Sequence, residues 1–170
     1  MKKVILISGS LRKSSLSSVL IQEARRVLQE KGLDTEIIDL KDESIPFCDG
    51  RPREEYPQNI QEIYEKIEKS DYAIFGMPVY CYSVSGPLKN FIDIFSRAFT
   101  GKYFGVCSAA GSKLSYLATA DLMKMMSFES KSIGIQPTIM ADNSDFKDGK
   151  IESLEIKERI AQMIEVLTVK

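Results

Sequence analysis

Histidine and tryptophan are absent from this chain, and cysteine occurs only three times. Without histidine, the chain has no Ser-His-Asp or Cys-His nucleophile pair, no histidine general base and no histidine metal ligand. Cys48, Cys81 and Cys107 lie too far apart in the sequence for a Cys-x-x-Cys motif, so we expect no redox dithiol and no metal site. An odd and sparse cysteine count is typical of a reducing compartment, and we therefore expect a cytoplasmic protein.

The chain also lacks an excess of charge of either sign and any long apolar run. The net charge is −1, from 23 basic and 24 acidic residues, which gives no electrostatic reason to expect nucleic acid or an anionic membrane as a partner. The apolar run from Val4 to Ile7 is too short for a signal-peptide core or a membrane span. The length of 170 residues, without repeats or a Gly/Ser linker, predicts a single domain over residues 1–170.

Strand-like and helix-like segments alternate along the chain, which predicts an α/β protein with a parallel sheet. Apolar periodicity predicts strands at residues 4–8, 35–40, 72–76, 103–108 and 132–139, and helices at residues 15–31, 58–69, from 87 onward, 113–129 and 151–168. Five such units fit a flavodoxin-like, doubly wound five-stranded sheet of order 2-1-3-4-5 in a three-layer α/β/α arrangement. Ligands of such sheets bind at the carboxyl ends of the strands, beside the point where the strand order reverses.

The connection at residues 42–57, after the second strand, is long for a βα loop. A lid, a binding edge and a simple surface insertion all fit this length, and the sequence does not distinguish them.

The loop after the first strand is rich in hydroxyl groups. Residues 8–18 read SGSLRKSSLSS, with six serines among eleven residues. Hydroxyls, free backbone N–H groups and the positive end of a helix together predict an anion site, and Arg12 adds a planar charged group suited to phosphate. The segment matches neither a Walker loop nor a GxGxxG motif, and it has no cysteine nucleophile. Helix capping by Ser14 or Ser15 explains only one hydroxyl, so we expect a loop that binds a terminal phosphate without reacting with it.

The loop expected after the third strand combines two prolines with aromatic surface. Residues 76–90 read GMPVYCYSVSGPLKN, in which Pro78 and Pro87 restrain the backbone. A fixed loop at a strand end can present backbone groups to a flat polar heterocycle. Alternatively, Tyr80 and Tyr82 only cover the rim of the core.

The loop after the fourth strand has small residues. Residues 107–116 read CSAAGSKLSY, and small side chains at 109–111 allow a ligand to approach the backbone. Because we expect a helix to begin just afterward, its positive end would favour negative charge near residues 110–112. A compact βα turn is the alternative interpretation.

These segments resemble a known family, the NADPH-dependent FMN reductases with a flavodoxin-like fold. GSLRKSS at 9–15 resembles the family's GSxRxxS phosphate motif, and GMPVY at 76–80 resembles its [ST]PxY flavin-ring motif. SGPLKNFID at 85–93 is similar to the PGxLKNxxD helix start, and SAAG at 108–111 is similar to the third, small-residue loop. The similarity spans residues 4–125, and the order and spacing of all four motifs agree.

The resemblance implies FMN as bound cofactor and NAD(P)H as cosubstrate. Hydride would pass to flavin N5 and on to a small acceptor such as a flavin, quinone, azo or nitro compound, and no side chain would be a catalytic residue. Two residues depart from the family's pattern. Ser17 stands where many relatives have Asn, and Val79 stands where many relatives have Glu. The departure at Val79 bears on substrate preference. Cys48 is alone in its loop, so we expect no iron–sulfur cluster. The cofactor-binding residues implied are Ser10, Leu11, Arg12, Ser15 and Ser17 around the phosphate, Met77, Pro78, Val79 and Tyr80 along the ring, and Ser108, Ala109, Ala110 and Gly111 near its pyrimidine side.

The resemblance also implies a homodimer or homotetramer. The third and fourth helices carry more apolar residues than one buried stripe uses, namely Ile94, Phe99, Met123 and Phe128, and such a surplus predicts a subunit interface. Two functions from other classes remain as alternatives. One is a non-enzymatic electron carrier of flavodoxin type, a class that is usually strongly acidic. The other is an α/β binding module without flavin.

Overall fold

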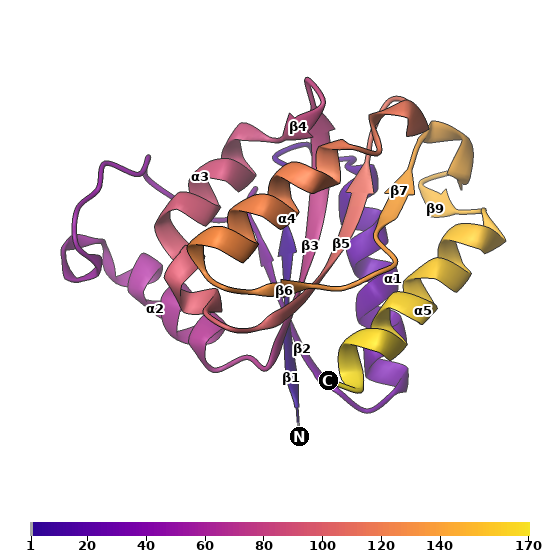
Figure 1. The fold of residues 1–170 in the computed structure, drawn as a ribbon. Coiled ribbons are helices and arrows are strands. Elements are labelled where there is room, and N and C mark those ends of the chain that lie inside the picture. The colour runs from indigo at the N-terminus through magenta and orange to yellow at the C-terminus, as the bar shows by residue number, and fades with distance from the viewer. Residues whose placement is uncertain (1) are drawn as a thin grey trace.

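A computed structural model describes residues 2–170 and contains a mostly parallel sheet between two helical layers (Figure 1). The strand order is β2-β1-β3-β5-β6, and β7 pairs with β5 farther along the same edge. Counted in the strands expected from the sequence, this order is 2-1-3-4-5, so the flavodoxin-like prediction is confirmed. The strands are β1 (Lys3–Ser8), β2 (Asp34–Asp39), β3 (Tyr72–Tyr80), β5 (Tyr103–Ala109), β6 (Ile133–Gly134) and β7 (Ile139–Ala141).

The two faces of the sheet bury two separate apolar clusters. Side chains alternate along β1, so Val4 and Leu6 pack with one helical layer while Ile5 and Ile7 pack with the other. The layer at the right of Figure 1 contains α1 (Leu16–Glu30) and α5 (Leu154–Thr168), and the layer at the left contains α2 (Gln58–Glu68), α3 (Gly86–Phe95) and α4 (Ala118–Glu129). The carboxyl ends of the strands lie between these layers at the top of the view.

The fourth helix begins later than the sequence pattern predicts. A short 3-10 helix, η3 (Lys113–Ser115), precedes it, and the Ser112 side chain accepts a hydrogen bond from the backbone N–H of Leu114 at 3.2 Å. The predicted helix over residues 113–129 is therefore wrong in its first turn. Leu114 and Leu117, which lie within the predicted helix, are 80% and 67% exposed.

The last strand and the last helix are also shorter than expected. β6 and β7 are two separate strands, because Pro137 lies between them and has no N–H group for the ladder. Before α5, the chain forms a hairpin of β8 (Phe146–Lys147) and β9 (Lys150–Ile151), so Ile151 packs from a strand and not from the helix.

Two of the four apolar residues that we expect at a subunit interface, Ile94 and Phe99, are buried in the core. The prediction of an interface from those two residues is therefore wrong.

The long connection after β2 is fixed to the helices beside it. The Asn90 side chain on α3 accepts a hydrogen bond from the Cys48 N–H at 2.8 Å and donates one to the Pro46 carbonyl at 2.9 Å. Asn59 on α2 donates to the Ser44 carbonyl at 3.1 Å.

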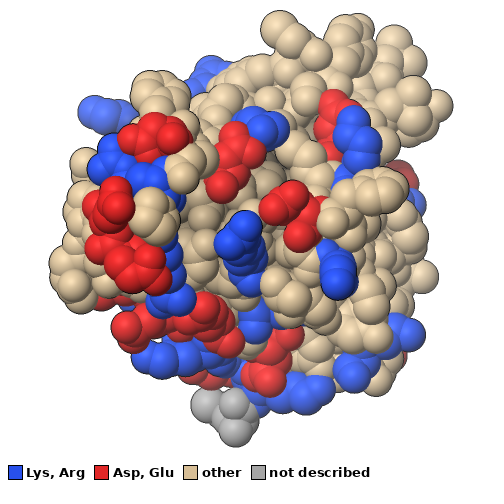
Figure 2. All heavy atoms as spheres, turned by 60° about the vertical axis from the view of Figure 1, so that its left-hand side comes forward, with Lys and Arg blue, Asp and Glu red and all other residues tan. Residues whose placement is uncertain are grey.

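The face of the molecule in Figure 2 carries interspersed charged groups of both signs. None of the helices within residues 2–170 combines the length and apolarity that crossing a bilayer requires.

Candidate functional site

Three segments that follow different strands surround one cavity at the carboxyl edge of the sheet. The cavity has a volume of about 380 Å³, within the range of sites for small ligands. The sequence predicts that these three segments meet, and the structure brings them together. The lining residues are Ser10, Arg12, Ser14, Ser15, Leu16, Ser17, Pro78, Val79, Tyr80, Ala109, Ala110, Gly111 and Asn143.

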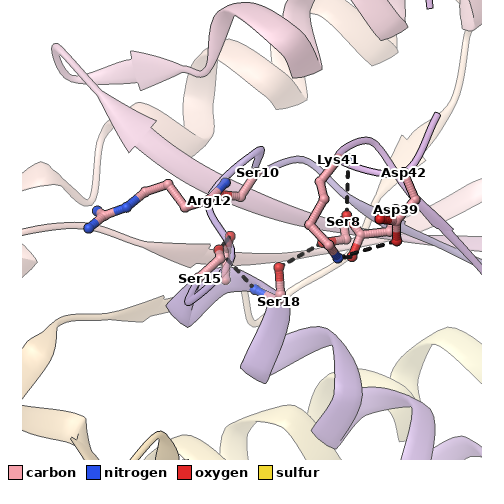
Figure 3. Close-up of polar contacts among 9 residues, drawn as sticks. Ser8, Ser10, Arg12, Ser15, Ser18, Asp39, Lys41 and Asp42 are labelled. Carbon is pink, nitrogen blue, oxygen red and sulfur yellow. Dashed lines mark hydrogen bonds and ion pairs between the residues drawn. The ribbon is translucent and has the colours of Figure 1, made fainter. Parts of the chain in front are cut away.

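The serines of the first segment divide into two groups. Ser8 and Ser18 lie 2.8 Å apart, oxygen to oxygen, and bond to each other away from the cavity (Figure 3). Ser15 caps α1 by accepting from the Ser18 N–H at 3.3 Å, and its hydroxyl lies 2.9 Å from that of Ser17. The hydroxyls on the cavity wall therefore lie at the positive end of α1, where an anion is stabilised.

Arg12 provides positive charge at this wall without an internal partner. It is exposed, and within residues 2–170 it forms no ion pair with a carboxylate. Figure 3 shows its guanidinium extending away from the Ser8–Ser18 pair. The Ser10 hydroxyl accepts from the Arg12 N–H at 3.2 Å and holds the backbone of this turn. A guanidinium and several hydroxyls at a helix N-terminus form a donor set suited to a phosphate dianion.

Two glycines allow the first segment to lie directly against β3 and α1. The Gly9 N–H donates to the Gly76 carbonyl at 2.9 Å. A Cβ atom on Gly9 would lie 2.8 Å from that carbonyl oxygen, and one on Gly76 would lie 2.4 Å from the Ile21 Cγ1 atom. Both positions therefore exclude a side chain without movement of the neighbouring atoms, and the position of the wall depends on both glycines.

The second wall is a strand and not the loop predicted from the sequence. β3 continues through Tyr80 and pairs with β4 (Ser83–Val84) in a hairpin. The two turn residues, Cys81 and Tyr82, have φ values of 50° and 59°, and a two-residue hairpin turn of type I′ requires positive φ at both positions. Pro78, Val79 and Tyr80 line the cavity from this rigid element.

Hydrogen bonds from the hairpin join the first segment to the helices. The Ser85 hydroxyl donates to the Gly9 carbonyl at 2.8 Å and also caps α3 by accepting from the Leu88 N–H at 3.3 Å. The Ser83 hydroxyl donates to Asp121 Oδ2 on α4 at 2.7 Å and lowers the pKa of that carboxyl. The walls therefore form one connected structure.

The third wall follows β5 and is fixed by β7. The Ala110 N–H donates to the Ala141 carbonyl at 3.0 Å. Because α4 starts at Ala118, residues 110–112 are not at its N-terminus, and the expected helix dipole at this wall is wrong. Asn143, the first residue of the 3-10 helix η4 (Asn143–Asp145), also lines the cavity, although sequence reasoning did not identify it.

Three of the expected site residues do not line the cavity. Met77 is buried in the core on the side of α2, α3 and α4. Ser108 is buried, and its hydroxyl donates to the Ile139 carbonyl at 2.6 Å. Leu11 is exposed but outside the lining. Within residues 2–170, no cluster of three or more histidine, cysteine, aspartate or glutamate side chains is arranged to bind a metal ion.

Comparisons with known proteins relate these features to a family. The family model for NADPH-dependent FMN reductase matches residues 2–145. The chain is 28% identical, over 95% of its length and 89% of the relative's, to an NAD(P)H-dependent FAD/FMN reductase of Geobacillus thermodenitrificans. It is 36% identical to an NAD(P)H:quinone oxidoreductase of Solanum tuberosum over 56% of this chain and 50% of that one. Its fold is similar to that of NADH:FMN oxidoreductase (EMOB) in its apo form, with a TM-score of 0.83 and 20% sequence identity. This match covers 99% of this chain and 89% of the other.

Proposed function

The chain belongs to the NADPH-dependent FMN reductase family, and we propose that the cavity at the carboxyl edge of its sheet is where it binds FMN and carries out its reaction. The protein is an NAD(P)H-dependent oxidoreductase that uses FMN. When bound, FMN would supply the hydride-transfer chemistry between nicotinamide and acceptor, and the residues of this chain would supply binding and orientation. The observation that carries the proposal is the convergence on one cavity of the serine-rich segment (residues 8–18), the β3–β4 hairpin and the β5 loop, which is the end of β5 with the connection to α4 (residues 109–117).

We assign the FMN phosphate to the wall formed by Ser10, Arg12, Ser15 and Ser17. Their fit to a phosphate follows from the donor set, since hydroxyls and an unpaired guanidinium occupy the positive end of α1. The negative charge of the phosphate would replace the missing carboxylate partner of Arg12. Leu11 stays a predicted contact of the same turn.

We assign the flavin ring to the space between the β3–β4 hairpin and the β5 loop. Pro78, Val79 and Tyr80 offer a rigid wall, and the small residues Ala109, Ala110 and Gly111 allow close approach to the backbone. Among these residues only Tyr80 has a polar group in its side chain, the hydroxyl. We therefore assign no catalytic side chain, in agreement with hydride chemistry that resides on the cofactor. Met77 and Ser108 support these walls from the core.

The experiment is a flavin titration followed by reduction. Purified protein freed of flavin is titrated with FMN while flavin fluorescence is recorded, and the complex is then mixed anaerobically with NADPH or NADH. We expect FMN binding and bleaching of the flavin absorbance, with reoxidation by a quinone or by free flavin. Azo and nitro compounds complete the acceptor panel. Binding of FMN without oxidation of either nicotinamide would indicate an electron carrier, and absence of FMN binding would indicate a flavin-free module.

We also propose that the chain forms a homodimer or homotetramer through α3 and α4. A groove of about 460 Å³ between these helices contains the apolar side chains of Ile92, Met125 and Phe128, and Phe128 is 86% exposed. Such surface is stabilised when a second subunit covers it. Light scattering at micromolar concentration is expected to give at least twice the chain mass, and Phe128→Asp is expected to lower it. A monomeric wild-type protein would contradict this proposal.

A cytoplasmic location is likewise our proposal. Cys48, Cys81 and Cys107 are all free thiols, in agreement with a reducing compartment, where NAD(P)H is also available. A fluorescent fusion protein is expected to distribute through the cytoplasm, and its export would contradict this location.

A further inference from the structure

Polar groups are unevenly distributed around the cavity. The guanidinium and the serine hydroxyls come from residues 10–17, in the loop after β1 and the first turn of α1, and β3 adds the hydroxyl of Tyr80. The wall contributed by β5 and β7 offers small side chains and a single polar one, that of Asn143. In the sheet, β3 and β5 separate β1 from β7, so the charged wall and Asn143 come from different ends of the site.

The backbone of Asn143 is held firmly while its side chain has no partner. Asp142 Oδ1 accepts from the Ser144 N–H at 3.0 Å, and Asp145 Oδ2 accepts from the Asp142 N–H at 2.9 Å, which closes a capping box around the turn. Lys113 of the β5 loop donates to Asp145 Oδ1 at 2.9 Å, and this hydrogen bond raises the pKa of Lys113. Asn143 is exposed and lines the cavity, and its side-chain amide forms no hydrogen bond within residues 2–170.

We propose that the side-chain amide of Asn143 binds the flavin ring of FMN, through the adjacent N–H and C=O groups on the edge of its pyrimidine portion. This inference depends on the proposed function and extends it by a binding residue. A mononucleotide has an anionic end and a neutral heterocyclic end. The anionic end belongs at Arg12 and the hydroxyls, which leaves the neutral end for the wall where Asn143 lies. A carboxamide has one donor group and one acceptor, so it can pair with such an edge in two hydrogen bonds, as Asn and Gln do with adenine.

The Lys113–Asp145 ion pair acts as a positioning contact in this arrangement. It joins the β5 loop to the turn that carries Asn143, so the two parts of the third wall keep a fixed separation. A preorganised amide loses less entropy on binding than a mobile one. Lys113→Met is therefore expected to weaken flavin binding in the same way as loss of the amide, but by a smaller factor.

The test measures binding of two flavins to apoprotein, through quenching of flavin fluorescence. FMN carries the phosphate and riboflavin does not. Asn143→Ala is expected to weaken binding of both flavins by the same factor, about 2- to 12-fold for each neutral hydrogen bond that is lost. Arg12→Ala is expected to weaken FMN binding and to leave riboflavin binding unchanged. Ser144→Ala is the control for the turn, because its hydroxyl bonds only within η4 and is outside the cavity lining.

Three results would overturn the inference while the wild-type protein still binds FMN. The first is unchanged affinity of Asn143→Ala for both flavins. The second is weaker binding of FMN alone, which would place the amide at the phosphate. The third is an equal loss in Ser144→Ala, which would attribute the effect to the turn. A wild-type protein that binds neither flavin would instead contradict the proposed function itself.

Discussion

Removal of the Ser85 hydroxyl tests the connection between two walls of the site. This buried hydroxyl caps α3 through the Leu88 N–H and also donates to the buried carbonyl of Gly9. Ser153 is the reference, because its hydroxyl caps α5 through the Ile156 N–H at 3.4 Å and forms no second hydrogen bond to any of residues 2–170. The two alanine variants therefore separate the contribution of the cap to the free energy of unfolding from the contribution of the hydrogen bond to Gly9.

The expected magnitudes differ by more than the error of an unfolding experiment. Loss of a serine cap lowers the free energy of unfolding by about 1 kcal/mol, which is the full expectation for Ser153→Ala. Ser85→Ala loses its cap and leaves the Gly9 carbonyl buried without a partner, which costs about 1–3 kcal/mol more. For a chain of this size, each kcal/mol corresponds to about 2–4 °C in the melting temperature.

Urea unfolding of both apoproteins, followed by circular dichroism, gives the comparison directly. We expect Ser85→Ala to be the less stable variant, with the same dependence on urea concentration as Ser153→Ala. Equal stability of the two variants, or greater stability of Ser85→Ala, would refute the claim that the bond to Gly9 supports the site.

The remaining predictions concern binding, backbone strain and a buried thiol. Arg12→Ala is expected to weaken FMN binding by about 10- to 150-fold, the value of one charge-assisted hydrogen bond, and unchanged affinity in a fluorescence titration would contradict the phosphate assignment. Replacement of Cys81-Tyr82 by Asn-Gly, which accepts positive φ readily, is expected to raise the free energy of unfolding in urea by about 1–2 kcal/mol, whereas a loss would show that the Tyr82 side chain stabilises the hairpin. Burial raises the pKa of the Cys107 thiol to about 12 from 9.0. As the pH rises, this thiol therefore ionises in the unfolded chain before it ionises in the folded one. Its contribution to the free energy of unfolding is complete below pH 9.0 and is lost as the pH rises toward 12. Cys107→Ala is expected to flatten this fall in pH-dependent unfolding, and in the native protein a thiol reagent is expected to modify Cys48 and Cys81 alone.

Local signals in the sequence were sufficient for most of the sheet and for two walls of the site. The strand order follows from five alternating units, and the serine-rich segment was correctly placed at the start of α1. Of the two serines expected to cap this helix, Ser14 or Ser15, the structure shows Ser15 as the cap. These predictions succeed because apolar periodicity and capping residues act over a few neighbouring positions. The assignment of each lining residue to a part of FMN stays a prediction.

The errors occurred where hydrogen bonds, and not the spacing of apolar residues, decide the local structure. Pro78 favoured a loop after Gly76, but backbone pairing between Val79 and Val84 makes a hairpin of the same residues. Leu114 and Leu117 continue the apolar spacing of α4, yet the Ser112 side chain competes for the backbone and starts a separate turn. A periodicity argument counts apolar positions and does not weigh such competition.

Asn143 was missed because its place at the site depends on a contact between remote segments. Nothing in the sequence around it marks a ligand. The pairing of β7 with β5, together with the hydrogen bond from the Ala110 N–H to the Ala141 carbonyl, brings it to the cavity. The same principle governs Gly9, whose N–H and C=O groups bond to Gly76 and to Ser85 on either side of the hairpin. Because a ligand in the cavity would touch all three segments, its binding free energy adds to the stability of these contacts. At saturating FMN, the stability difference between Ser85→Ala and wild type is therefore expected to stay the same if the variant binds FMN as tightly as wild type, and to grow if it binds FMN more weakly. The size of that growth reports how far the bond to Gly9 supports the walls of the cavity.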